Sequence, residues 1–378
     1  MTSIEKKTGR PSILPDDLME KTIQTIDALR LKGAPVSSVV VNAVAKGIVI
    51  ANDRCILTEY GGYLTLSNDW ARKVLYKMET MGRKMTRRMA TTSKAPIAPG
   101  VLKEIKPDFQ RKIKQLQSLY EIPYDLILNF DQTPLPYVCS SNHTLHEKGA
   151  SSVPIVGKGK KKQITGTFTV LKSGNFLPPQ LIYEGKTDRC LPKGVAFPED
   201  FDKTYTSNHW SNEEKAIQHV ERIVIPYLKK KREELKLPST QKALLIFDVF
   251  KGQTTAAYQE VVESNDCVIV FVPANMTNHF QPLDLTVNGP AKQFLKQKFK
   301  SWYATQITKQ FNKGKNVYDV EVPLKLSALK PIHANWLIGL YDYLRNNQDM
   351  IRKGFEEAGI NEALSIELEQ EDPFHDLD

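Results

Sequence analysis

The chain has 378 residues, of which 41% are hydrophobic and 25% charged, and it carries a formal net charge of +9. This length predicts two or three domains, and the composition is that of a globular protein, which argues against a disordered or fibrous class. The four cysteines form no C-x-x-C pair and no apolar run approaches roughly 20 residues, so a zinc site, a disulfide framework and a membrane helix are not expected. The excess of positive charge favours a polyanionic partner.

Residues 1–90 are expected to be helical. Asp16–Leu31 has apolar residues at helical spacing, Ser37–Asn52 follows as a second helix, and Ser67 or Asn68 can cap a third, basic helix. This order predicts a helix-turn-helix domain, although a small helical bundle with a solvated basic face fits the same pattern. The residues expected to contact DNA here are Arg72, Lys73, Lys77, Arg83, Lys84, Arg87 and Arg88.

A linker and a helix are expected over residues 91–120, with the linker over 91–104 and the helix over Phe109–Tyr120. The next basic segment is a run of lysines directly before a predicted strand, which could follow a phosphate backbone or form a solvated loop. Its candidate DNA contacts are Lys160, Lys161 and Lys162.

Residues 121–310 alternate predicted strands and helices. Gln163–Leu171 and Phe176–Tyr183 are typical of a hairpin, and Asn212–Leu235 of a long amphipathic helix. The order of strands and helices predicts a mixed α/β domain. Residues 311–362 are expected to be a helical extension of it, and residues 363–378 an acidic disordered tail. Trp210 and Trp302 are expected to pack in the core.

Three aspartates, Asp131, Asp248 and Asp284, each end a stretch rich in apolar residues. A carboxylate just past a buried strand leaves the core on a rigid support, where active sites of such sheets are built. Three carboxylates brought together need a cation between them, and Mg²⁺ prefers oxygen ligands. The pattern therefore predicts metal-dependent phosphoryl transfer on a nucleic acid, with these residues as catalytic groups and metal ligands. A single aspartate after a strand is more often a turn former or a helix cap, and Asp131 alone fits that alternative.

The sequence resembles the pogo/Tigger branch of the mariner-like DNA transposases, members of the DDE superfamily whose relatives include jerky-type proteins and centromere protein B. The stretches that carry the resemblance are Asn129–Thr133, Lys162–Thr165, Leu177–Lys186, Leu245–Asp248, Phe271–Thr277, Gln281–Asp284, Gly289–Lys292 and Phe355–Ile360.

The resemblance implies an α/β fold: an RNase-H-like mixed-sheet catalytic core preceded by an all-α helix-turn-helix domain of the centromere-protein-B type. It implies that Asp131, Asp248 and Asp284 coordinate two Mg²⁺ or Mn²⁺ ions, cut DNA at terminal inverted repeats and join the freed 3′ ends to target DNA. Double-stranded DNA is then the partner, a homodimer the active assembly and the nucleus the location. No membrane and no small-molecule substrate are expected.

The resemblance is incomplete at three places. Gln132 and Val249 stand where the family often has Glu and Asn, and the region before the core has room for one helix-turn-helix unit where the family usually has two. Two other functions therefore stay open. One is a domesticated, transposase-derived nuclear DNA-binding protein without catalysis, which the missing unit favours. The other is an RNase-H-type RNA nuclease. The intact aspartates favour the transposase.

Overall fold

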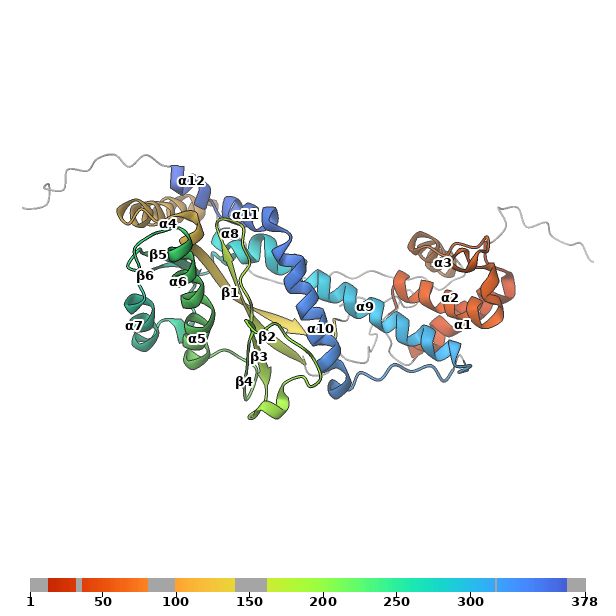
Figure 1. Ribbon diagram of the computed structural model, residues 1–378. Coiled ribbons are helices and arrows are strands. Elements are labelled where there is room, and N and C mark those ends of the chain that lie inside the picture. The colour runs from red at the N-terminus through yellow and green to blue at the C-terminus, as the bar shows by residue number, and fades with distance from the viewer. Residues whose placement is uncertain (1–12, 32–35, 81–98, 140–161, 317, 366–378) are drawn as a thin grey trace, which may run out of the picture. The chain divides into compact units, whose positions relative to one another are not determined.

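The computed structural model describes residues 13–31, 36–80, 99–139, 162–316 and 318–365 (Figure 1). The chain divides into two compact units, each made of separate segments. The first unit comprises residues 1–92, 138–161 and 296–325, and the second comprises residues 93–137, 162–295 and 326–378. The domains predicted from the sequence were contiguous ranges instead.

The first unit is helical in its described part. α1 (Asp16–Leu31), α2 (Ser38–Asp53) and α3 (Asn68–Thr80) confirm the three helices predicted from periodicity. Ser67 caps α3, since its Oγ accepts a hydrogen bond from the N–H of Trp70 at 3.1 Å. The second part of α9 (Asn288–Asn312) also packs here, where an added Cβ on Gly47 would lie 2.9 Å from the Phe311 ring. The all-helical prediction is confirmed, and the helix-turn-helix assignment stays a prediction.

The second unit is built on a six-stranded sheet in the order β4-β3-β2-β1-β5-β6. β1, β2 and β3 are antiparallel, β5 and β6 continue the sheet in parallel with β1, and β4 pairs in parallel with β3 at the edge. This arrangement confirms the expected RNase-H-like mixed sheet. The strands are β1 (Ile127–Pro136), β2 (Gln163–Leu171), β3 (Gln180–Glu184), β4 (Asp202–Thr206), β5 (Ala243–Asp248) and β6 (Cys267–Val272).

Three strands differ from their predictions. β1 does not end at Asp131 but continues to Pro136, because β2 pairs with it from Leu128 to Pro136. The return strand of the hairpin begins at Gln180, since Pro178 and Pro179 have no N–H to give to the sheet. β4 was not predicted because its sequence, DKTYT, is short and polar.

Helices cover both faces of the sheet (Figure 1). One face carries the long helix predicted from amphipathicity, which a π turn divides, and its His219 lies against Phe130 with ring centroids 5.3 Å apart. On the other face, Tyr341 of α10 packs against Phe201, with ring centroids 5.0 Å apart. The helices are α4 (Pro99–Leu119), α5 (Glu213–His219), α6 (Ile225–Glu234), α7 (Ala256–Ser264), α8 (Thr277–Phe280), α10 (Leu326–Arg345), α11 (Gln348–Glu357) and α12 (Ile360–Ser365).

α4 begins at Pro99, inside the predicted linker. A proline at the first helical position lacks only an N–H that would have no intrahelical partner anyway, so it starts a helix as readily as it breaks one. The pattern Pro-x-x-Pro-Gly around it was therefore misread as a linker.

Candidate active site

Asp131 and Asp248 lie on two neighbouring strands, β1 and β5. The parallel pairing of β1 with β5 stops at Asn129 and Ile246, so the strands separate just before the two aspartates. Both carboxylates line the cavity of about 170 Å³ that opens there, together with Gln132, Phe250 and others. Asp248 ends its strand as predicted. Asp131 lies inside a strand, and it reaches a cavity because, of its two neighbouring strands, only β2 is still paired with β1 at this position.

Asp284 lies close to Asp131, and one amide group joins them. Asp284 belongs to a π turn, Leu283–Val287, that runs directly into α9. The Nδ2 of Asn288 donates to Oδ2 of Asp131 at 2.7 Å and to Oδ1 of Asp284 at 2.9 Å. The sequence analysis missed Asn288. Its position four residues after Asp284 is the signal that could have found it, since such residues share one face of a helix.

Asp248 has different partners. Its Oδ2 accepts from the hydroxyl of Thr277 at 3.1 Å, and its Oδ1 accepts from the N–H of Val249 at 2.7 Å. Among the described residues, no three His, Cys, Asp or Glu side chains are grouped so that they could hold a metal ion. The structure thus brings Asp131 together with Asp284, and Asp131 with Asp248 across the cavity, but it does not gather all three around one point.

The electrostatics of Asp131 reflect this crowding. Burial raises its pKa from 3.8 to about 7, and the negative charge of Asp284 acts in the same direction. The hydrogen bond from Asn288, the N–H of Gln132 and the charge of Lys292 oppose the rise. Asp131 is therefore partly protonated near neutral pH, because its burial and then the neighbouring carboxylate of Asp284 both disfavour its charged form.

The donor set fits a hard divalent cation. The three aspartates supply carboxylate oxygens, which Mg²⁺ and Mn²⁺ prefer. In addition, the Oδ1 of Asn288 is buried and has no hydrogen-bond partner. A buried polar atom without a partner is rare, and this oxygen belongs to the amide whose nitrogen bonds both carboxylates; amide oxygens are ligands that such cations also accept.

A buried amide holds the segment of Asp284 against β1. The Nδ2 of Asn129 donates to the carbonyl of Ile246 at 2.8 Å and to Oε1 of Gln281 at 3.1 Å. Its Oδ1 accepts from the N–H of Leu283 at 3.0 Å. All the side-chain hydrogen-bonding atoms of Asn129 are thus used to fix the turn that carries Asp284.

α11 holds the same turn from the other side. The hydroxyl of Thr286 donates to the carbonyl of Met350 at 2.8 Å. An added Cβ on Gly354 would lie 2.8 Å from the carbonyl oxygen of Pro282 and 2.6 Å from the Thr286 hydroxyl, so only glycine lets the helix approach this closely. The position of Asp284 is therefore set from both flanks.

The basic residues expected to bind DNA are placed only in part. Arg72 and Lys73 are exposed on α3, where Arg72 pairs with the exposed Asp69 at 2.7 Å. Lys162 is exposed directly before β2. Their role stays a prediction. The side chain of Lys77 and all of Arg83, Lys84, Arg87, Arg88, Lys160 and Lys161 lie outside the described residues.

The prediction that Trp210 packs in the core is wrong. Its side chain is 62% exposed, in the loop between β4 and α5. The loop holds its backbone outward, because Thr206 Oγ1 donates to the Trp210 carbonyl at 2.9 Å and the Trp210 N–H donates to Asn208 Oδ1 at 3.1 Å. Trp302 is half-buried on α9. Within the ranges that the structure describes, no helix combines the length and apolarity needed to cross a membrane.

Comparison with known proteins shows a family. The sequence pattern of the DDE superfamily endonucleases matches residues 161–355, just over half of the chain. The match includes Asp248 and Asp284, whereas Asp131 precedes it. The chain is 26% identical over 226 residues to the Pogo transposable element with KRAB domain of Homo sapiens, and 23% identical to that of Mus musculus. These alignments cover 58% of this chain and 35% of each relative, so the chain spans about a third of the relatives' length.

Solved structures of similar arrangement include a pre-cleavage Mos1 transpososome, with a TM-score of 0.37 and 11% identity over 92% of this chain and 82% of that one. The catalytic domain of Mos1 mariner transposase gives a TM-score of 0.34 and 11% identity over 68% of this chain and 98% of its own. From the match of its sequence over residues 161–355, this chain belongs to the DDE superfamily endonucleases.

Proposed function

We propose that this chain cuts and joins DNA as a transposase, with Asp131, Asp248 and Asp284 as its catalytic residues and as ligands of two Mg²⁺ or Mn²⁺ ions. The observation that carries the proposal is the pair formed by Asp131 and Asp284 on the amide of Asn288, beside a cavity that Asp248 also lines. A structural role does not explain such crowding, since two neighbouring carboxylates are unfavourable without a cation.

When bound, the ions would supply the charge that activates a water or a 3′-hydroxyl and stabilises the leaving oxygen. The chain's own groups position the reaction. Asn129 fixes the turn of Asp284, and Asn288 keeps Asp131 and Asp284 side by side. The proton on Asp131 is held at its carboxyl group and has to leave before that group binds a cation, so cation binding and proton release are linked.

The substrate, assembly and location are part of the same proposal. DNA with terminal inverted repeats is the substrate, a homodimer is the active assembly and the nucleus is the place of action. The net charge of +9 and the exposed Arg72, Lys73 and Lys162 support a polyanionic substrate. The similarity to proteins named as Pogo transposable elements supports the choice of DNA.

A second candidate is a domesticated DNA-binding protein that keeps the core as a scaffold. One observation favours it: in the described part of the chain, Asp248 is hydrogen-bonded to Thr277 and does not group with the other two aspartates as a metal site. Catalysis requires all three carboxylates to gather around the metal ions, whereas a scaffold does not.

The test is cleavage of a plasmid that carries the inverted repeats flanking the gene. The purified chain is incubated with Mg²⁺, with Mn²⁺ and with chelator, beside Asp248→Asn and the control Asp319→Asn, which changes an exposed aspartate of the other unit. The transposase is supported if cuts appear at the repeat ends only with metal. These cuts should persist in Asp319→Asn and be absent in Asp248→Asn. DNA binding without cleavage under either metal supports the domesticated protein instead.

A further inference from the structure

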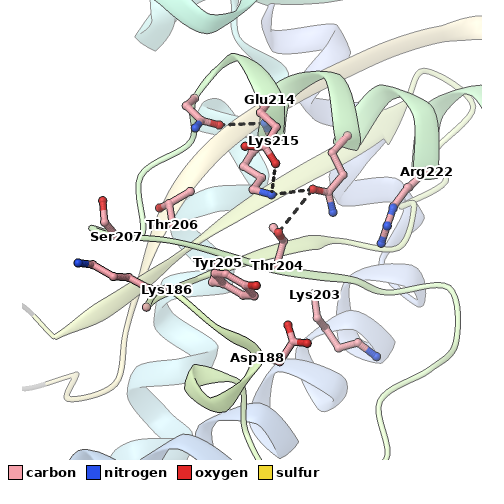
Figure 2. Close-up of a pocket in the computed structure, with 13 residues that line it drawn as sticks. Lys186, Asp188, Lys203, Thr204, Tyr205, Thr206, Ser207, Glu214, Lys215 and Arg222 are labelled. Atoms are coloured by element: carbon pink, nitrogen blue, oxygen red, sulfur yellow. Dashed lines mark hydrogen bonds and ion pairs between the residues drawn. The ribbon is translucent and has the colours of Figure 1, made fainter.

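A second and larger hollow lies on the outer edge of the sheet, and the active site uses none of its residues. It has a volume of about 730 Å³ and opens between β4, the loop after β3 and the helix that begins with α5 (Figure 2). We name it the edge groove. Its charged and aromatic lining residues are Lys186, Asp188, Lys203, Tyr205, Glu214, Lys215 and Arg222.

The floor of the edge groove is a network of hydrogen bonds around Asp202, which is buried. Its Oδ1 accepts from Gln218 at 2.8 Å and from Arg222 at 3.3 Å, and its Oδ2 accepts from Gln180 at 2.8 Å. Lys215 in turn donates to Oε1 of Gln218 at 3.0 Å. A network in which each buried polar group has a partner is rigid, so the groove is pre-formed.

Two cations of the edge groove are available to a ligand. Lys215 is paired with Glu214 at 2.8 Å. In the described part of the chain, Lys186 and Lys203 form no ion pair, and Lys203 instead lies over the Phe197 ring at 5.2 Å. Figure 2 shows them on either side of Tyr205. Two lysines without carboxylate partners along one polar groove are suited to successive phosphates of a nucleic-acid backbone.

An exposed tryptophan stands at the rim. Trp210 lies in the loop whose flanking residues Ser207 and Asn212 line the edge groove. Its side chain is 62% exposed although its backbone is fixed by two hydrogen bonds. An exposed aromatic ring at the rim of a groove lined by lysines is an arrangement suited to single-stranded nucleic acid, because unpaired bases stack on such a ring while bases in a duplex are already stacked.

The edge groove lies next to the catalytic cavity. Gln253 lines the cavity, and Asn212 lines the groove. Between them, the backbone at Gly252 packs so closely on the start of α5 that an added Cβ would lie 2.9 Å from the nitrogen of Glu213 and 3.0 Å from the carbonyl carbon of Asn212. The cavity and the edge groove are therefore neighbours, separated by this one tight backbone contact.

We infer that the edge groove binds a single strand of DNA as it leaves the catalytic cavity. Lys186 and Lys203 contact its phosphates, and Trp210 stacks on one of its bases. This inference rests on the proposed function, because it supplies the path of the strand that the active site cuts. It adds a binding site for unpaired DNA to the duplex contacts expected of the helical unit.

The test measures binding of a fluorescent single-stranded oligonucleotide and of its duplex to the full chain in chelator. Trp210→Ala should weaken single-strand binding about 5- to 150-fold, and Trp210→Phe should weaken it less, because a smaller ring still stacks. The double variant Lys186→Ala with Lys203→Ala should lower the salt dependence of single-strand binding by about 1.4 in log–log slope, since each lost phosphate contact contributes about 0.7. Duplex binding should change little in all of them.

Two controls keep the test specific. Tyr63→Ala removes an aromatic side chain that is 78% exposed in the other unit, and Lys230→Ala removes an exposed lysine of α6. Equal losses in the controls, or no loss in the groove variants, would overturn the inference, as would competition by inorganic phosphate as strong as that by the oligonucleotide. Binding is read without metal, so a chain that binds in the groove but never cuts overturns only the proposed function.

Discussion

Replacing Asp284 by Asn removes one charge from the carboxylate pair and tests its electrostatics. Oxygens of Asp131 and Asp284 accept from the same Asn288 nitrogen, at 2.7 and 2.9 Å. Two unit charges on the order of 5 Å apart repel by about 3 kcal/mol at an effective dielectric constant of about 20. Both carboxylates are half-buried, so solvent screening lowers this repulsion to about 1–2 kcal/mol.

The sign of the pH dependence follows from the pKa of Asp131, which burial and Asp284 raise from 3.8 to about 7. Between these values the folded state holds a proton that the unfolded state has released, so the free energy of unfolding falls as pH rises from about 4 to about 7. Asp131 lowers the free energy of unfolding by at most about 4 kcal/mol over this range, and below about pH 4 it causes no further change with pH. Asp284→Asn should lower the pKa of Asp131 and shorten this fall.

The assay is urea unfolding in chelator at pH 5 and pH 8, with Asp319→Asn as the control. We compare the free energy of unfolding of Asp284→Asn with that of the wild type. This difference should be about 1–2 kcal/mol more in favour of the variant at pH 8 than at pH 5, because at pH 5 Asp131 is protonated and the repulsion is absent. Adding Mn²⁺ at pH 8 should stabilise the wild type more than the variant, because the ion replaces the missing countercharge. A difference that is the same at both pH values, as in the control, would show that the two carboxylates do not interact and refute the reasoning.

Three more predictions concern the frame of the site. Asn129→Ala should lower the free energy of unfolding by about 2–5 kcal/mol, because it leaves buried partners unpaired. A double-mutant cycle with Gln281→Ala should show a coupling of about 1–3 kcal/mol, and additive effects of the two substitutions would contradict the network. Gly252→Ala should cost about 1–3 kcal/mol by urea unfolding, whereas Gly289→Ala, which meets no atom within 4 Å, should be neutral or stabilising. Burial lowers the pKa of His219 to about 3, so the free energy of unfolding of the wild type should fall by about 2 kcal/mol between pH 6.5 and pH 5 through this group. The fall should be smaller in His219→Asn. Equal dependence of the two unfolding free energies on pH would rule out this burial effect.

Local pattern predicted most of the elements in the described part of the chain. α1 and β2 have the ranges that periodicity indicated, because an amphipathic or alternating repeat is a property of neighbouring residues. Two wrong predictions also came from the local sequence pattern. β4 lacks the apolar residues that indicate a strand, and Pro99 begins a helix inside a segment that we predicted to be a linker because of its prolines. The exposure of Trp210 had no signal in its neighbours, because it depends on hydrogen bonds that close a loop.

The candidate site divides in the same way. The sequence by itself determined which carboxylates are candidates, since Asp248 and Asp284 lie in motifs that can be read along the chain. Only the tertiary structure decided how they meet. Asn288 reaches Asp131 across 157 positions, and the cavity exists because β1 and β5 part after Asn129. Such contacts depend on how distant segments pack, and packing is the sum of many weak interactions that no single stretch of sequence records.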